Sequence, residues 1–416
     1  MSTNNNRFQY IEYQKTLKNL SITESHPGSV VKDFEMLLLS IKDEIQVSGI
    51  NNLLPMRLLP KLNASLSKPI EILLKRPQQK SYPHINGLYL LLRATALGLI
   101  IAKEKSNILR LNEEYIKKWN DLNNTEQYFT LLQAWWCRGS GEVLGDFVTG
   151  GLDFRYRCID FFTKIPGKGL LINQDTRIFE KLKYYPGICN LALMELFGMV
   201  SIKHGSPNEK NKGWNIECIK ATEIGDALIG SFIEALGNLD HQAYWASTEI
   251  SRSKDFNGWF ASIQNYFSEF KQLLTYPEHQ SQSGIHIVKV SLLNCWMRIA
   301  VSGNMDIDEF ASSILEAFDF DQEHLYNFTY QNRFGITTSI DHPEMLLETF
   351  NRDKICIGEL PLYPGSEVIF EYDLIDRWQF KIIVEEIEPE AIETYHFHIL
   401  EKHGKSPRQY GSDMNL

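Results

Sequence analysis

Hydrophobic and polar positions alternate along a stretch near the C-terminal end of the chain. Val368, Phe370 and Tyr372 fall on one face of an extended segment. The next run repeats the pattern with Trp378, Phe380, Ile382 and Val384. A period of two is typical of β-strands with one buried side. Residues 373–376 separate the runs and begin and end with Asp, a short polar residue that favours a turn, so the stretch predicts an antiparallel hairpin.

The residues before this hairpin predict the rest of one C-terminal domain. Segments 285–292 and 295–301 alternate as strands, and residues 324–330 are extended and aromatic. Asp306 and Glu309 form an Asp-x-x-Glu capping box, which marks a helix start. The apolar stripe of that helix consists of Ile307, Phe310, Ala311, Ile314, Leu315 and Phe318. We therefore predict an α+β domain with an antiparallel sheet over residues 284–416.

The N-terminal two-thirds has the three- and four-residue apolar spacing of helices. A polar segment covers residues 1–30, a helical stripe runs from Val31 to Ile45, and short helical pieces are predicted at 58–66 and 70–74. The polar run 276–284 marks a domain boundary. The fold class predicted for the whole chain is multidomain α+β.

Two segments about one hundred residues apart, 83–119 and 186–228, repeat one order of elements. Each predicts a helix, a glycine, a strand, a turn, a strand and a second helix. Gly98 and Gly198 fit the left-handed position that ends a helix, and Asn112 and Thr222 suit N-caps. The pattern resembles a winged helix, so we expect one winged-helix-like module in residues 31–135 and another in residues 136–280.

Composition indicates a globular protein without a membrane span. Hydrophobic residues make up 43% of 416 residues and charged residues 23%. The N-terminus shows no secretory pattern, and the apolar run 88–102 is too short to cross a membrane. The six cysteines form no Cys-x-x-Cys pair, which favours reduced thiols. We therefore expect a cytoplasmic protein.

Charge is divided unevenly along the chain. Residues 284–416 hold 10 Lys and Arg against 23 Asp and Glu, a balance of −13, whereas residues 1–283 have 32 against 29, or +3. An acidic domain repels a phosphate backbone, so a nucleic-acid contact would belong to the N-terminal region. Its most basic stretch is either a solvated face or a phosphate-contacting patch, and comprises Lys61, Lys68, Lys75, Arg76 and Lys80.

The helices in the position of DNA-reading helices have few groups for base readout. Segment 88–99 offers only Arg93, and segment 191–200 offers Glu195. Helices that are apolar on nearly every face are usually buried. We therefore favour a scaffolding or protein-contact role for both modules over DNA recognition, and a protein as the partner.

Several C-terminal motifs follow one another in an order that resembles a known family. They are Trp-x-Arg-Ile (296–299), Phe-Asp-Phe-Asp (318–321), His-Leu-Tyr-x-Phe (324–328), Tyr-Asp-x-x-Asp-x-Trp (372–378) and Gly-x-x-Pro-x-x-Tyr-Gly (404–411). The region from about Ile285 onward resembles the plasmid pRiA4b ORF-3-like family, also labelled TnpR-like insertion-sequence passenger proteins. The resemblance implies a bacterial protein linked to plasmids or mobile elements. It does not imply a particular activity. Longer members carry winged-helix-like segments ahead of this domain. Ile375 stands where the family usually has glycine, which would make a left-handed turn position costly.

The candidate binding residues come from these motifs and are His324, Tyr326, Asp373, Asp376 and Trp378. Asp373 and Asp376 suit a cation or a partner's basic group, or they cap the turn. The acidic residues around Asp321 have the composition of a nuclease site, but a solvated helix end explains them as well.

His396 and His398 share a face of one predicted strand, but no carboxylate or cysteine lies at a ligand-like spacing. We therefore assign no metal ligand and no cofactor, and no catalytic arrangement stands out. The leading hypothesis is a non-catalytic interaction or adaptor protein associated with plasmids or mobile elements, including a form that acts in defence. The alternatives are a DNA-binding winged-helix regulator and a metal-dependent hydrolase.

Overall fold

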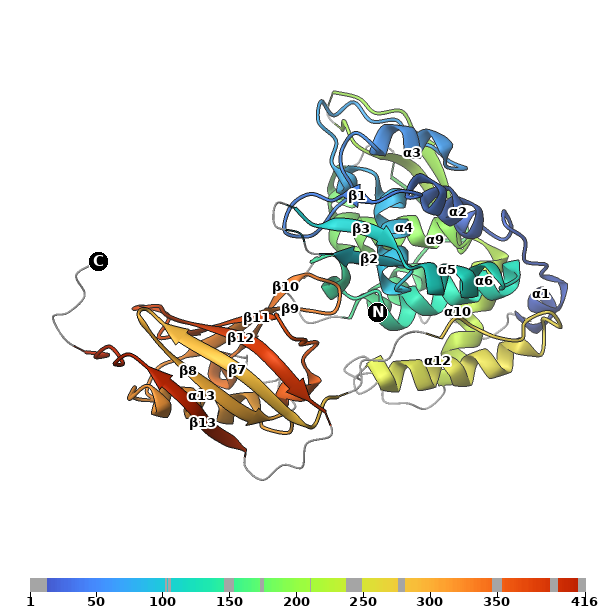
Figure 1. Cartoon of the computed structure of the whole chain (residues 1–416). Coiled ribbons are helices and arrows are strands. Elements are labelled where there is room, and N and C mark those ends of the chain that lie inside the picture. Colours follow the sequence, from blue (N-terminus) through green and yellow to red (C-terminus); the bar gives the residue numbers. More distant parts are fainter. Residues whose placement is uncertain are drawn as a thin grey trace, which may run out of the picture. The chain divides into compact units, whose positions relative to one another are not determined.

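The chain forms two compact units, Met1–Tyr276 and Pro277–Leu416, which we call the N-terminal unit and the C-terminal domain. The computed structural model describes residues 13–101, 103, 106–145, 153–172, 176–209, 211–236, 249–275, 281–345, 354–389 and 396–410 (Figure 1). The N-terminal unit is mainly helical and the C-terminal domain holds an antiparallel sheet, which confirms the predicted α+β class.

The first half of the N-terminal unit folds as a small helical module with a three-stranded antiparallel sheet of order β1-β3-β2. Its elements are α2 (Val30–Ser40), β1 (Ile45–Gln46), α3 (Leu59–Ser65), η1 (Gln79–Ser81), α4 (Pro83–Ala94), β2 (Gly98–Ile101) and β3 (Ile108–Leu111).

The second half contains a module with the same order of helices and strands and an antiparallel sheet of order β4-β6-β5. Its elements are α7 (Phe154–Thr163), β4 (Leu170–Leu171), α8 (Thr176–Leu182), the π-helical η4 (Lys183–Gly187), α9 (Ile188–Leu196), β5 (Val200–Gly205) and β6 (Asn215–Ala221). The internal repeat is therefore present, whereas the assignment of either module as a winged helix stays a prediction.

Helices α4 and α9, one from each module, pack against each other. Every residue of α4 is buried, as are residues 191–196 of α9. The contact is close at Gly87, where an added Cβ atom would lie 2.9 Å from Leu193 Cγ. These two helices stand in the position where a winged helix would place its DNA-reading helix. Because each buries its side chains against the rest of the unit, neither offers a free face to a DNA groove.

The remaining helices of the N-terminal unit include those that share an aromatic core, in which Phe129 stacks on Phe270 with ring centroids 4.5 Å apart. These helices are α1 (Tyr13–Asn19), α5 (Glu113–Asn120), α6 (Asn124–Gln133) with the π-helical η2 (Ala134–Arg138), η3 (Gly141–Val143), α10 (Glu223–Leu236) and α12 (Glu249–Gln264). None of the described helices has the length and apolar character of a membrane span.

Three local predictions in the first module are wrong. The helix from Val31 ends at Ser40, and Ile45 lies in a strand opposite Leu109. Residues 70–74 are not helical, because the Leu73 N–H donates across the chain to the Lys212 carbonyl at 2.8 Å. Gly98 begins a strand instead of ending a helix.

The left-handed conformation is adopted two residues before Gly98, by Ala96, with φ 56°. The equivalent prediction holds in the second module, where Gly198 has φ 73°. The Gly225 N–H also donates to Thr222 Oγ1 at 2.9 Å, as expected of an N-cap.

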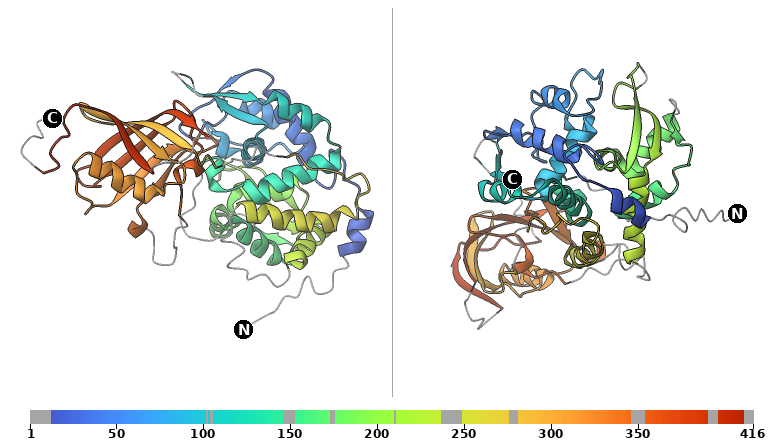
Figure 2. Two further views of the ribbon diagram at one scale, coloured as in Figure 1. Left: turned by 60° about the horizontal axis from the view of Figure 1, so that its bottom comes forward. Right: turned by 90° about the vertical axis from the view of Figure 1, so that its right-hand side faces the viewer.

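The C-terminal domain is a seven-stranded antiparallel sheet with α13 (Ile307–Ala317) against one face (Figure 2). The capping box prediction locates this helix correctly, since Asp306 Oδ1 accepts from the Asp308 N–H. The strand order is β10-β9-β11-β12-β7-β8-β13. These strands are β7 (Ile285–Leu292), β8 (Cys295–Ser302), β9 (Tyr326–Gln331), β10 (Thr337–Asp341), β11 (Glu367–Tyr372), β12 (Trp378–Glu388) and β13 (Phe397–His403), with short 3-10 turns η5 (Pro343–Met345) and η6 (Ile357–Glu359).

The predicted hairpin is formed by β11 and β12, whose last pair is Tyr372 opposite Trp378. All seven alternating apolar residues of the pattern are buried. The loop that joins the strands has positive φ at Asp373 (57°) and Arg377 (55°), but not at Ile375. The expected cost of isoleucine at the glycine position is therefore absent, because the left-handed conformation falls on other residues, and aspartate tolerates it well.

Candidate functional site

Side chains from two other motifs converge on the carboxylate of Asp321. The Tyr372 hydroxyl, at the end of β11, donates to Asp321 Oδ1 at 2.6 Å. Gln409 Nε2 donates to the same oxygen at 2.9 Å, and the Tyr410 hydroxyl donates to Oδ2. We call Asp321, His324, Tyr372, Asp373, Gln409 and Tyr410 the Asp321 cluster. It ties the closing motif of the chain to the sheet.

His324 connects this carboxylate to the hairpin loop. Its Nε2 atom lies 2.9 Å from the Tyr410 hydroxyl, and its Nδ1 atom lies 3.6 Å from Asp373 Oδ2. Because the Tyr410 proton is directed to Asp321, its oxygen accepts from the imidazole. The predicted residues His324 and Asp373 therefore meet in one network.

The hydrogen bonds of the cluster set the charge of Asp321. Burial acts to raise the pKa of this carboxyl, but the hydrogen bonds from Tyr372, Tyr410 and Gln409 outweigh it and hold the pKa well below its usual range. The bond to Asp321 in turn raises the pKa of Tyr410 to about 12. Asp321 is therefore an anion whose lone pairs are used by the protein itself, which favours an anchoring role over metal binding.

The other predicted binding residues divide between the loop and the core. Asp373 is buried, and its Oδ1 atom accepts from the Ile375 N–H at 2.9 Å and the Asp376 N–H at 3.3 Å, so it caps the turn. Asp376 is exposed. Trp378 is buried with its ring centroid 5.0 Å from that of Phe320. Buried Tyr326 donates to Asp308 at 2.6 Å. Trp378 and Tyr326 are therefore part of the core of the domain.

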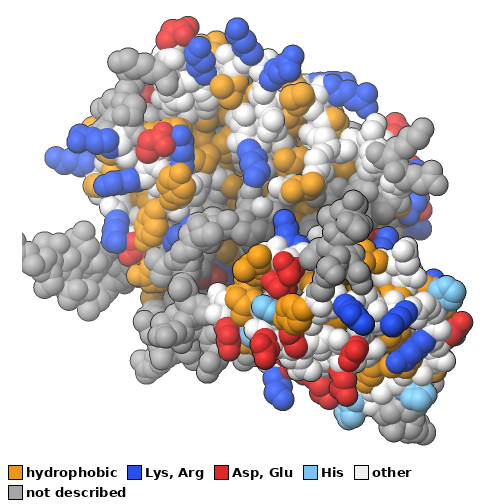
Figure 3. Space-filling view, turned by 90° about the vertical axis from the view of Figure 1, so that its left-hand side faces the viewer, with side chains coloured by type: hydrophobic (Ala, Val, Ile, Leu, Met, Phe, Trp, Pro, Cys, Tyr) orange, Lys and Arg blue, Asp and Glu red, His pale blue; other side chains and the backbone are white. Residues whose placement is uncertain are grey.

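Apolar side chains are exposed beside the Asp321 cluster. Ile375 is 89% exposed at the tip of the hairpin loop, its neighbour Leu374 is also exposed, and Tyr410 is 61% exposed. Hydrophobic and acidic side chains lie next to one another on the face of the C-terminal domain in Figure 3. Such a mixture of apolar and charged groups can contact a partner.

The predicted basic residues of the N-terminal unit do not share one environment. Lys61, Lys75, Arg76 and Lys80 are exposed, as a solvated face requires. Lys68 differs, because its Nζ atom lies 2.8 Å from Oε1 of the buried carboxylate of Glu195. This contact belongs to a polar cluster that the sequence patterns do not predict.

Glu195, near the end of α9, accepts from groups on three other segments. Its Oε2 atom lies 2.9 Å from Nε2 of His84 on α4 and 2.9 Å from Nε2 of His204 on β5. We call Lys68, His84, Glu195 and His204 the Glu195 cluster. His84 and Glu195 are buried, whereas the His204 side chain is 21% exposed. Both imidazoles make T-shaped contacts with the Trp214 ring, and the ring centroids are 4.9 Å apart for His84 and 5.7 Å apart for His204.

The electrostatics of Glu195 follow from these contacts. Burial acts to raise the pKa of the carboxyl, but the hydrogen bonds from His204 and His84 outweigh it and lower the pKa well below its usual range. The Nδ1 atom of His84 and the indole N–H of Trp214 are buried without a hydrogen-bond partner. The sequence does hold one signal for this cluster, because Glu195 is a single acid on the otherwise apolar helix α9, and a buried carboxylate requires partners.

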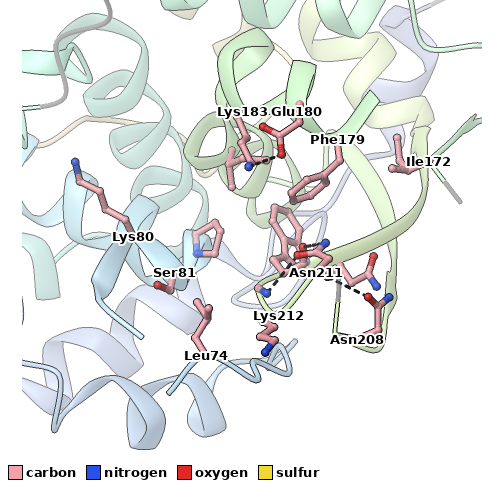
Figure 4. Close-up of a pocket in the computed structure, with 15 residues that line it drawn as sticks. Leu74, Lys80, Ser81, Ile172, Phe179, Glu180, Lys183, Asn208, Asn211 and Lys212 are labelled. Carbon is pink, nitrogen blue, oxygen red and sulfur yellow. Dashed lines mark hydrogen bonds and ion pairs between the residues drawn. The ribbon is translucent and has the colours of Figure 1, made fainter. Parts of the chain in front are cut away.

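Trp214 also lines a cavity of about 670 Å³ (Figure 4). Its apolar lining includes Phe179 and Ile188, and its charged lining includes Glu180, Lys183 and Lys212. Lys183 Nζ lies 2.6 Å from Glu180. Three asparagines complete the polar part: Asn208, Asn211 and Asn215.

His396 and His398 are exposed. Within the described part of the chain, the residues whose donor atoms converge as a metal requires are His84, Glu195 and His204, all within 4.8 Å of one another.

Comparison with known proteins adds a family but no activity. None of the curated proteins matches the chain. Among solved structures, a protein of unknown function from Methanosarcina mazei Go1 is 21% identical, over 30% of this chain and 71% of that one, with a TM-score of 0.26. Residues 284–409, which include every member of the Asp321 cluster except Tyr410, match the family model described as plasmid pRiA4b ORF-3-like protein. The resemblance inferred from the motifs is thereby confirmed for this part of the chain, which is similar to the plasmid pRiA4b ORF-3-like proteins.

Proposed function

We propose that the chain is a non-catalytic interaction protein whose C-terminal domain binds a protein segment with a basic side chain beside an apolar one. The observation that carries this proposal is Ile375, an 89% exposed side chain at the tip of the hairpin loop. A large aliphatic residue so exposed, where the family usually has glycine, gains nothing from burial within this domain. Contact with a partner would bury it.

The loop that presents Ile375 is held in place. The buried Asp373 carboxylate accepts two loop N–H groups, and His324 faces its second oxygen. Tyr372, immediately before the loop, is fixed by its bond to Asp321. A side chain presented on a pre-organised loop loses little conformational freedom on binding, which favours affinity.

The charge around the loop indicates the chemistry of the partner. Asp376 and Glu323 are exposed acids on the loop and near the cluster. The neighbouring Arg377 lies 3.3 Å from Glu371, so its charge is balanced locally. With a balance of −13 over residues 284–416, the domain attracts basic segments and repels acidic ones. A link to plasmids or mobile elements enters this proposal through the family description alone.

Selection from a random-peptide library tests the proposal. The full chain is the bait, and Ile375→Asp is the counter-bait. We expect peptides with Lys or Arg beside an aliphatic or aromatic residue to be enriched on the wild type and lost on the variant. The matched control is Leu293→Asp, because Leu293 is 73% exposed in the turn between β7 and β8 of the same domain. No enrichment, or equal enrichment on both baits, contradicts the proposal.

The DNA-binding alternative rests on the exposed Lys61, Lys75, Arg76 and Lys80, because α4 and α9 are buried against each other. Anisotropy of labelled duplex DNA with the full chain separates the two functions. Micromolar binding that falls steeply with salt and is lost in Lys75→Glu/Arg76→Glu would favour the regulator. If the chain does not bind duplex DNA at low salt, the regulator alternative fails and the proposed interaction function stands.

A further inference from the structure

Two imidazoles and one carboxylate converge where the two modules of the N-terminal unit meet. His84 lies in the first turn of α4, Glu195 near the end of α9 and His204 in β5. We propose that His84 Nε2, Glu195 Oε2 and His204 Nε2 bind a divalent transition metal ion, with Zn²⁺ the ion that fits best. This site lies outside the domain that carries the proposed function, so the two inferences stand independently.

The donor set selects the kind of metal. Imidazole nitrogen suits zinc and its first-row neighbours, whereas calcium and magnesium prefer oxygen ligands throughout. Two histidines and one glutamate form a recognised three-ligand set for zinc that leaves a fourth position open. The cluster contains no cysteine or second carboxylate. A hard cation is therefore disfavoured.

The distances are compatible with coordination. Both nitrogens lie 2.9 Å from the same carboxylate oxygen, and the three donor atoms lie within 4.8 Å of one another. Bonds of about 2.0–2.2 Å in a tetrahedral arrangement place the ligand atoms about 3.3 Å apart. Opening each contact by a few tenths of an ångström, through small side-chain rotations, would admit the ion.

The surroundings orient the ligands. Lys68 occupies Glu195 Oε1 at 2.8 Å, which leaves Oε2 to act as a single donor atom. Trp214 makes T-shaped contacts with both imidazoles and restricts their rotation. Such outer contacts commonly fix the geometry of metal ligands. The 21% exposure of His204 provides access from solvent and a position for a water ligand.

A metal here would cross-link the two modules. His84 belongs to the first module, whereas Glu195 and His204 belong to the second. Without an ion, Glu195 Oε2 must accept hydrogen bonds from both imidazoles. An ion would replace two competing hydrogen bonds with three coordinate bonds and would stabilise the packing of α4 on α9.

Zinc titration of the chelator-treated full chain tests the proposal. Calorimetry should show one equivalent of Zn²⁺ bound with a Kd below about 1 µM, and thermal unfolding should shift upward with excess zinc. In His204→Gln, whose amide can still donate to Glu195, affinity should fall at least roughly tenfold. Cobalt substitution provides a second readout, because tetrahedral Co²⁺ absorbs strongly in the visible range.

The control is His396→Gln, which removes an exposed histidine of the C-terminal domain and should leave zinc binding unchanged. Circular dichroism and the melting curve without metal establish that both variants fold. If the folded wild type takes up no zinc at micromolar concentration, or if His204→Gln binds as tightly as the wild type, the site is not a metal centre. The cluster is then a hydrogen-bonded contact between modules.

Discussion

The Tyr372 hydroxyl donates a 2.6 Å hydrogen bond to Asp321 Oδ1, and this bond joins the hairpin to the segment after α13. Gln409 and Tyr410 bind the same carboxylate, so the closing motif is held by one residue. We therefore predict that Asp321→Asn loosens both the hairpin loop and the closing motif. The expected loss of stability of the C-terminal domain is about 1–3 kcal/mol.

Hydrogen exchange followed by mass spectrometry measures this effect directly. Peptides that cover residues 366–380 and 401–410 should exchange faster in Asp321→Asn than in the wild type. Asp319→Asn is the matched control, because Asp319 is exposed two residues earlier and asparagine also tolerates its φ of 64°. Equal exchange in both variants would show that Asp321 is not the anchor.

The pH dependence of the same domain follows from the lowered pKa of Asp321. A carboxyl with a pKa lower in the folded than in the unfolded state contributes stability above its unfolded pKa of about 4. That contribution is lost as the pH falls through the lower, folded value. The melting temperature of the wild type should therefore exceed that of Asp321→Asn by a constant amount above about pH 5, and the gap should narrow below about pH 4. A gap that widens on acidification would contradict this assignment.

In the N-terminal unit, we predict that Glu195→Gln is strongly destabilising. The amide keeps the shape but leaves Lys68 and the two imidazoles without their shared anion, at a cost of about 2 kcal/mol or more. Tryptophan fluorescence in urea reports on this unit, which holds six of the eight tryptophans. Glu217→Gln serves as the control, because the ion pair Lys203–Glu217 is exposed. Loss of this pair should leave the urea concentration at the midpoint of unfolding unchanged.

Backbone geometry at Gly198 gives a further prediction. Gly198 has φ 73°, and an added Cβ atom would lie 2.3 Å from the Pro27 carbonyl oxygen. Gly198→Ala should therefore destabilise the N-terminal unit by more than about 2 kcal/mol in urea unfolding. Gly258→Ala should instead raise stability by up to about 1 kcal/mol, because Gly258 lies on an exposed part of α12 with nothing near its Cβ position. Equal effects at both positions would contradict the strain argument.

The sequence predicts the elements that local patterns define. The hairpin and α13 follow from alternation and a capping box, which depend on residues a few positions apart. Ile45 was misplaced because its apolar spacing continues that of α2, whereas its strand pairs with Leu109, far along the chain. β10 was missed because residues 337–341 have no alternating apolar face.

The sites were harder to predict because their contacts are long-range. His84 and Glu195 are 111 positions apart, and Asp321 and Tyr410 are 89 apart. The motifs of the C-terminal domain do identify His324 and Asp373, but the acidic pattern around Asp321 fits a solvated helix end as well as a site. Its partners Tyr372 and Gln409 become its neighbours only when the sheet forms.

The claim that the loop around Ile375 is a protein-docking surface is tested most directly by peptide affinity. A labelled peptide selected on the wild-type chain is titrated by fluorescence anisotropy against wild type, Ile375→Asp and Leu293→Asp. We predict a Kd of about 10 µM for the wild type and for Leu293→Asp, and binding at least about tenfold weaker for Ile375→Asp. Equal affinity for Ile375→Asp and the wild type would contradict the account.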